Sequence, residues 1–94
     1  MEIQLFMGCD ISQDSFHYCL RNSTEILLEG QINNGLKPIR AWLKELRKTH
    51  QMDLSTILFC LEHTGIYSTF LLRELSEQSL LICLESAMNI KLSL

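Results

Sequence analysis

Several features are scarce in this chain of 94 residues, and each scarcity narrows what the protein can be. It has one proline and no repeat, low-complexity stretch or linker, so we expect residues 1–94 to form one small domain. No apolar run reaches the roughly 18 residues that a membrane-spanning helix needs. The first residues also lack the basic start of a signal peptide. These absences predict a cytoplasmic protein with no membrane partner.

Cysteine is present, but not in the spacing that binds zinc or indicates a disulfide framework. The sequence contains no C-x-x-C pair, and each cysteine sits inside an apolar run. This distribution predicts reduced, buried thiols in a cytoplasmic protein. The residues are Cys9, Cys19, Cys60 and Cys83.

Positive charge is also in short supply, because eight lysines and arginines face eleven acidic residues and the net charge is -3. A free-standing nucleic-acid binder is usually basic. Any role with nucleic acid must therefore come from a local patch, a metal ion or parts of a larger protein. Hydrophobic residues make up 47% and charged residues 20% of the chain, which is typical of a globular domain and not of a disordered one.

The first third of the chain has the periodicity of strands. Residues 3–9 are almost wholly apolar, as in a strand that is covered on both faces. Residues 15–21 alternate between apolar and polar positions, and residues 25–32 predict a third strand. Short polar turns separate the three, so we expect an antiparallel meander. The inward side of the third strand is predicted to hold Ile26, Leu28 and Ile32.

The remainder alternates between helix and strand. Residues 36–49 carry an apolar stripe at helical spacing, and residues 55–61 form another apolar strand that can lie parallel to the first. Residues 65–78 predict a second helix with Thr64 as its N-cap, and residues 80–84 a last strand. The whole is an α/β arrangement with a mixed sheet of about five strands, in the β-β-β-α-β-α-β order of an RNase H-like (RuvC-like) partial fold. The expected stripes are Ile39, Trp42, Leu43 and Leu46 in the first helix and Ile66, Tyr67, Phe70, Leu71 and Leu75 in the second.

Two acidic residues follow the two apolar strands. Asp10 comes directly after the first and Glu62 directly after the fourth, so parallel pairing of these strands brings both acids to the same carboxyl edge. Neighbouring carboxylates repel one another unless a cation lies between them, and Mg²⁺ or Mn²⁺ prefers such oxygen ligands. Two such metals would serve in-line phosphoryl transfer. An acid at the end of a strand is also common in structural roles, so position alone leaves both interpretations open.

The residues around these acids resemble two signatures of the DEDD transposases of the IS one-ten insertion-sequence family. Residues 8–12 read G-C-D-I-S, similar to the family's G-x-D-x-S, which a strand follows. Residues 60–67 read C-L-E-H-T-G-I-Y, similar to an apolar pair followed by E-x-T-G-x-Y. Residues 33–43 resemble the asparagine-led turn and the helix with a W-L core that lie between them. The resemblance runs from about residue 3 to residue 91.

This resemblance implies a RuvC-like nuclease domain with four metal-binding acids, of which Asp10 and Glu62 match the first two. Members of the family bind Mg²⁺, excise and insert DNA, and are guided by a structured bridge RNA. Their third and fourth acids lie in a K-x-D-x-x-D segment, and a later domain carries a serine that helps in strand exchange. The sequence ends at Leu94, before these parts. We therefore expect weak Mg²⁺ or Mn²⁺ binding and no cleavage by this chain alone.

Further residues are candidates for contacts with nucleic acid. Ser12, Thr64 and Gly65 flank the two acids and could contact phosphate, although a hydroxyl that caps a turn or a helix explains the first two equally well. His63 could help in proton transfer and Glu85 could face the same edge of the sheet, but both are interpreted as solvated surface residues. One face of the first predicted helix is basic, which suits either a phosphate backbone or an ordinary solvated surface. Its residues are Lys37, Arg40, Lys44, Arg47 and Lys48.

Two other functions remain open. A nucleotide-binding domain of the actin and sugar-kinase type shares the β-β-β-α-β-α-β core, but it normally has glycines in its first hairpin, and residues 10–16 contain none. A non-catalytic module could instead dimerise through exposed apolar surface. Whether the chain is part of a transposase or a dimerising module, we expect it to form a homo-oligomer.

Overall fold

A mixed sheet of five strands forms the centre of the computed structural model, which describes residues 4–62 and 66–85. The spatial order is β3-β2-β1-β4-β5. Strand β1 pairs antiparallel with β2 and parallel with β4, while β3 and β5 lie at the two edges. The predicted α/β class, strand number and element order are confirmed. The strands are β1 Leu5–Ile11, β2 Ser15–Arg21, β3 Ile26–Asn33, β4 Ile57–Glu62 and β5 Leu81–Glu85.

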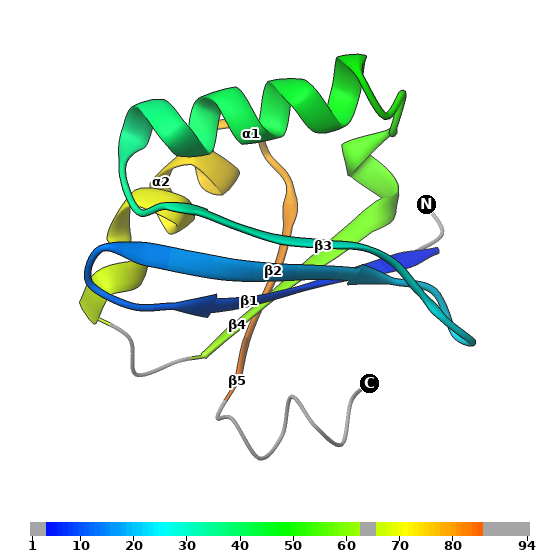
Figure 1. Cartoon of the computed structure of the whole chain (residues 1–94), viewed down its shortest axis with the longest axis horizontal. Helices are drawn as coiled ribbons and strands as arrows, with labels where there is room; N and C mark the ends of the chain where they lie inside the picture. Colours follow the sequence, from blue (N-terminus) through cyan, green and yellow to red (C-terminus); the bar gives the residue numbers. More distant parts are fainter. Residues whose placement is uncertain (1–3, 63–65, 86–94) are drawn as a thin grey trace.

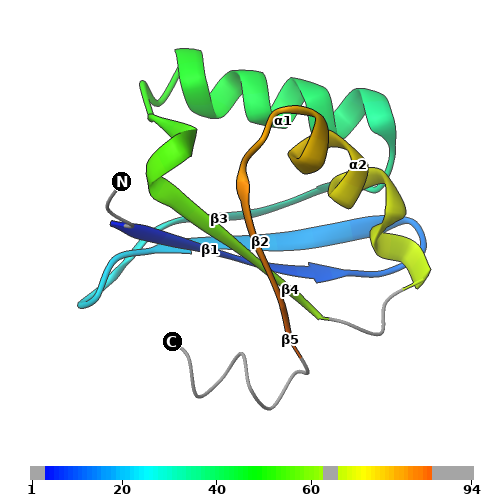
Figure 2. The same cartoon turned by 180° about the vertical axis from the view of Figure 1, so that it is seen from behind.

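Both helices of the described chain lie on the same face of this sheet (Figure 1, Figure 2). Helix α1 spans Leu36–Lys48 and links β3 to β4, and α2 spans Thr69–Glu77 and links β4 to β5. Two 3-10 turns precede β4 and α2, at Leu54–Thr56 (η1) and Ile66–Ser68 (η2). Each helix thus lies between two parallel strands, as such connections require.

An aromatic cluster around Trp42 fills the space between α1 and the sheet. The Trp42 ring lies 5.1 Å from Phe16, 5.0 Å from Tyr18 and 6.2 Å from Phe59, measured between centroids. Two of these contacts are edge-on, the arrangement that aromatic quadrupoles prefer. Every member of the stripe predicted for the first helix is buried, so that prediction is confirmed.

Strand β1 is longer at its carboxyl end than the apolar run predicts. Asp10 and Ile11 remain paired with His17 and Phe16 of β2, and the turn is confined to residues 12–14. Asp10 therefore lies within the strand and not in the turn after it. The strand was predicted to end before Asp10 because that side chain is polar. Backbone pairing with β2 does not depend on the side chain, so the strand continues through Asp10.

One predicted inward position of β3 is wrong. Leu28 and Ile32 pack against the core, but Ile26 is 55% exposed. The register between β2 and β3 shifts at Leu20 and Arg21, where an irregularity interrupts the pairing. An extra residue in one strand reverses which face the following side chains occupy, so the alternation does not continue to Ile26.

The start of the second helix also departs from the prediction of a helix over residues 65–78. The chain first forms η2, and α2 begins only at Thr69. Tyr67 and Phe70 are 41% and 42% exposed, so their predicted place in the apolar stripe is wrong, whereas Leu71 and Leu75 are fully buried. A 3-10 turn advances by three residues per turn, which shifts the phase of the helix face.

No disulfide joins the four cysteines, all of which belong to the described residues, and burial divides them into two pairs. Cys9 and Cys60 are buried, as predicted, but Cys19 and Cys83 are only half-buried. Burial raises the pKa of the Cys9 thiol, and the nearby Cys60 raises that pKa further. No described helix is both long and apolar enough to cross a bilayer.

Candidate metal site at the carboxyl edge of the sheet

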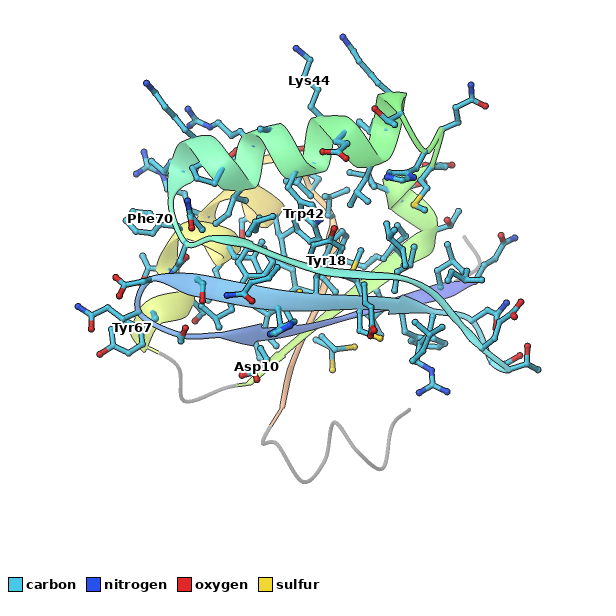
Figure 3. The ribbon with its side chains drawn as sticks, viewed as in Figure 1. Asp10, Tyr18, Trp42, Lys44, Tyr67 and Phe70 are labelled. Carbon is cyan, nitrogen blue, oxygen red and sulfur yellow. The ribbon has the colours of Figure 1, made fainter. Side chains whose placement is uncertain are left out.

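Asp10 lies near the carboxyl end of β1 on the face of the sheet that carries neither α1 nor α2. Its neighbour Cys9 is buried in the core, and alternation along the strand sends Asp10 to the opposite side. The Asp10 side chain is exposed, and Figure 3 shows it pointing away from the helices. This carboxylate is therefore open to water and to a ligand.

The backbone register places Glu62 beside Asp10. The last recorded pair between the parallel strands β1 and β4 is Cys9 with Leu61, and Asp10 and Glu62 are the next residues of those strands. Neighbouring strands are about 4.8 Å apart. The two positions are thus close enough for one divalent cation to accept a ligand from each strand. The assignment of both residues as ligands stays a prediction.

The same register extends across the whole sheet. His17 pairs with Asp10 on one side, and Glu85 pairs with Glu62 on the other. A polar residue from every strand thus falls in one transverse row, which is Gln31, His17, Asp10, Glu62 and Glu85. The place of Glu85 at the end of the last predicted strand already left it open as a residue of this edge. No pattern in the sequence grouped His17 with the two acids, because strand register is not readable from the sequence.

The chemistry of this row suits a hard cation bound weakly. Two carboxylate positions, of which Asp10 is exposed to water, match the way Mg²⁺ keeps several water ligands and takes one or two carboxylates. Within residues 4–62 and 66–85, no three His, Cys, Asp or Glu side chains gather as a ready metal cluster.

Ser12 has a local role in the structure. Its hydroxyl donates a hydrogen bond to the Ser15 carbonyl oxygen at 2.9 Å and lies 3.3 Å from the Ser15 hydroxyl. The side chain thus closes the β1–β2 turn, as turn hydroxyls commonly do. Thr64, Gly65 and His63 fall outside the described residues.

The basic face of α1 does not lie at the carboxyl edge of the sheet, where Asp10 and Glu62 are found. Its five basic residues are exposed, but the Lys44 side chain points away from the sheet, on the far side of the molecule from Asp10 (Figure 3). Arg40 is also engaged elsewhere, since its guanidinium Nε lies 2.9 Å from the Glu74 carboxylate of α2. Nucleic acid held along α1 would therefore lie across the sheet from Asp10.

Asn34 is a residue of this edge that pattern reasoning did not single out. It follows β3, and its amide nitrogen contacts both the β1–β2 turn and η2. Such contacts join segments more than 20 residues apart in the chain. The only signal in the sequence was an asparagine in a turn, which has many local explanations.

Comparisons with protein-family models and with curated protein sequences give no match. Among solved structures, the chain is similar to a protein from Bacteroides thetaiotaomicron described as having an actin-like ATPase fold and unknown function. The TM-score is 0.69 at 13% identity, over 97% of this chain and 37% of that one. A Ppx/GppA family member from Aquifex aeolicus has a TM-score of 0.48 at 14% identity, over 89% of this chain and 35% of its own length. This chain thus spans just over a third of these proteins, and the first likeness shows a shared fold.

Proposed function

We propose that this chain is the first part of the RuvC-like catalytic domain of a DEDD transposase of the IS one-ten type. The observation that carries the proposal is the register of β1 and β4, because Asp10 and Glu62 occupy adjacent positions on neighbouring parallel strands. The acids lie at the sheet edge where open α/β sheets hold their ligands. The family resemblance of residues 8–12 and 60–67 supports the same two residues independently.

In this proposal Asp10 and Glu62 are ligands of Mg²⁺ or Mn²⁺. A bound ion would activate the attacking hydroxyl or water and stabilise the leaving oxygen in cutting and joining DNA. The Asp10 carboxylate is exposed on the open face of the sheet, where the phosphate backbone of a DNA strand could reach an ion held by the two acids. These two residues match the first two of the four acids in the family's set.

The partners in this proposal are DNA and the element's bridge RNA, with a homo-oligomer as the assembled form. The basic face of α1 supplies five exposed cationic side chains for a phosphate backbone. Because α1 lies across the sheet from Asp10, the strand held there differs from the strand that is cut.

A second candidate is a nucleotide-binding domain of the actin type, which the TM-score of 0.69 favours. In that case the β1–β2 hairpin would hold the phosphates of the nucleotide. Here the turn reads Ser12-Gln13-Asp14, without glycine and with an acid where phosphate would approach. Like charges repel, so this turn favours a metal ion over a free phosphate.

A manganese titration followed by NMR separates these functions. We expect millimolar Mn²⁺ to broaden the backbone signals around Asp10 and Glu62, and Asp10→Asn to abolish the effect. Asp14→Asn is the matched control, since Asp14 is an exposed acid in the adjacent turn. Broadening that survives Asp10→Asn, or affinity in the micromolar range, would contradict the proposal. Thermal stabilisation by ATP would favour the actin-type function instead.

A further inference from the structure

Asn34 connects three segments of the chain at the carboxyl edge of the sheet. Its side-chain nitrogen Nδ2 donates to the Ser12 carbonyl oxygen at 3.0 Å and to the Tyr67 carbonyl oxygen at 2.9 Å, with the Gln13 carbonyl oxygen at 3.4 Å. The backbone N–H of Asn34 donates to the Asp14 carbonyl oxygen at 2.9 Å. One residue thus binds the β1–β2 turn from both its backbone and its side chain, and also binds η2.

These partners are the segments that follow the two acids. Ser12 comes two residues after Asp10, and Tyr67 comes five residues after Glu62. Figure 3 shows Tyr67 at the same end of the molecule as the β1–β2 turn. The Asn34 amide therefore ties the chain leaving the Asp10 strand to the chain that returns after the Glu62 strand.

Only a donor can make these contacts. The three acceptors are backbone carbonyl oxygens that converge on one nitrogen, and a primary amide offers two hydrogens to them. The other amide atom, Oδ1, is buried and has no hydrogen-bond partner among the described residues. A buried acceptor without a partner costs about 1–3 kcal/mol, which offsets part of the stabilisation from the hydrogen bonds that Nδ2 donates.

We propose that Asn34 is a positioning residue that sets the separation of Asp10 and Glu62. This inference rests on the proposed metal site at those residues. Mg²⁺ demands near-ideal octahedral geometry, so a shift of roughly 0.5 Å between its ligands weakens binding. By joining the segments beyond both acids, the Asn34 amide limits how far β1 and β4 can move apart or slide at this edge.

Asn22 offers a matched control for a purely structural role. It lies in the β2–β3 turn, at the opposite end of β2 from the acidic edge. Its Oδ1 accepts hydrogen bonds from the backbone N–H groups of Thr24 at 2.9 Å and Glu25 at 2.8 Å. Asn22 is therefore an acceptor within its own turn, whereas Asn34 is a donor between distant segments.

The test compares Asn34→Ala with Asn22→Ala by amide hydrogen exchange and by Mn²⁺ titration of the 94-residue chain. We expect Asn34→Ala to speed exchange in both the β1–β2 turn and η2, and to weaken Mn²⁺ binding at Asp10 roughly tenfold, as loss of a group that orients metal ligands does. Asn22→Ala should speed exchange only in its own turn and leave Mn²⁺ binding unchanged. Asn34→Ser, which keeps one donor, should fall between wild type and Asn34→Ala.

Each failure has a separate signature. If Asn34→Ala changes exchange in one segment alone, or leaves Mn²⁺ affinity as in Asn22→Ala, Asn34 is not a positioning residue. If the wild-type chain shows no Mn²⁺ broadening at Asp10, the proposed metal site fails, and the positioning role that rests on it fails as well. Exchange would then still report whether Asn34 couples the two segments. If Asn34→Ala does not fold, the same exchange and Mn²⁺ measurements are made on Asn34→Ser, with Asn22→Ser as its control.

Discussion

Gly30 shows how a single atom can decide a residue's identity in this fold. It lies in β3 opposite Tyr18 of β2, and a Cβ built on it would be 2.7 Å from the Tyr18 hydroxyl oxygen and 2.9 Å from the ring carbon Cζ. The Tyr18 ring also packs against Trp42, with the ring centroids 5.0 Å apart, so a shift of the ring would disturb that contact. Glycine is therefore needed here for space and not for an unusual backbone angle.

We predict that Gly30→Ala destabilises the protein by about 1–3 kcal/mol, the usual cost of forcing extra atoms into a packed region. The measurement is urea unfolding followed by tryptophan fluorescence, which reports on Trp42 directly. Gly8→Ala is the control, since a Cβ at Gly8 would approach only the Cys19 carbonyl oxygen, at 3.9 Å. Equal losses for the two variants would show that the Tyr18 contact does not matter.

At the scale of elements, a half-exposed ion pair joins the two helices. The Glu74 side chain of α2 is only 4% exposed, and Arg40 of α1 reaches it with a side chain that is 56% exposed. A buried carboxylate is costly without a partner, so Glu74 ties α2 to α1. Since water screens the Arg40 side, the contribution is smaller than for a fully buried pair.

We expect Arg40→Ala to lower the free energy of unfolding by about 1–3 kcal/mol, because it leaves the Glu74 carboxylate buried without its charged partner. A second change, Glu74→Leu, should restore most of the loss by removing that charge. Arg73→Ala is the matched control on α2, where the Arg73–Glu77 pair is exposed and should be worth less than about 0.5 kcal/mol. Chemical unfolding of the three variants checks this, and an unrescued double variant would contradict it.

At the scale of the whole molecule, positive charge is concentrated on one helix. Helix α1 contains five of the chain's eight lysines and arginines and a single acid, Glu45. Lys37, Lys44 and Lys48 are spaced by seven and four residues, so they form one line along the helix, opposite its buried stripe. Because Arg40 is held by Glu74, this lysine line is the better candidate for contact with phosphates.

Reversal of one charge on this line tests the proposed contact with nucleic acid. Lys44→Glu should weaken binding to duplex DNA or RNA at low salt and reduce the salt slope of the affinity by roughly one. Arg73→Glu, the same reversal on the exposed surface of α2, should have less effect. Fluorescence anisotropy over a range of salt concentrations measures both, and unchanged affinity for Lys44→Glu would remove α1 as a binding surface.

Local pattern by itself determined the kinds of elements and their order. The apolar runs, the alternation of residues 15–21 and the stripe around Trp42 depend on neighbours within one strand or helix, and these predictions are confirmed. The predicted ends of two elements differ from the structure, at Asp10 in β1 and at the start of α2. There, pairing with another strand or a 3-10 turn outweighs the preference of the residues themselves.

Only the tertiary structure decided what lies beside what. The register between β1 and β2 brings His17 beside Asp10, and the Asn34 amide meets carbonyl groups from two distant segments. Neither follows from a pattern along the chain, because a slip of one residue in strand pairing would move every such side chain to the other face. Asp10 and Glu62 were visible as candidates from sequence, but the feature that would hold them in place became visible only once the strands were paired.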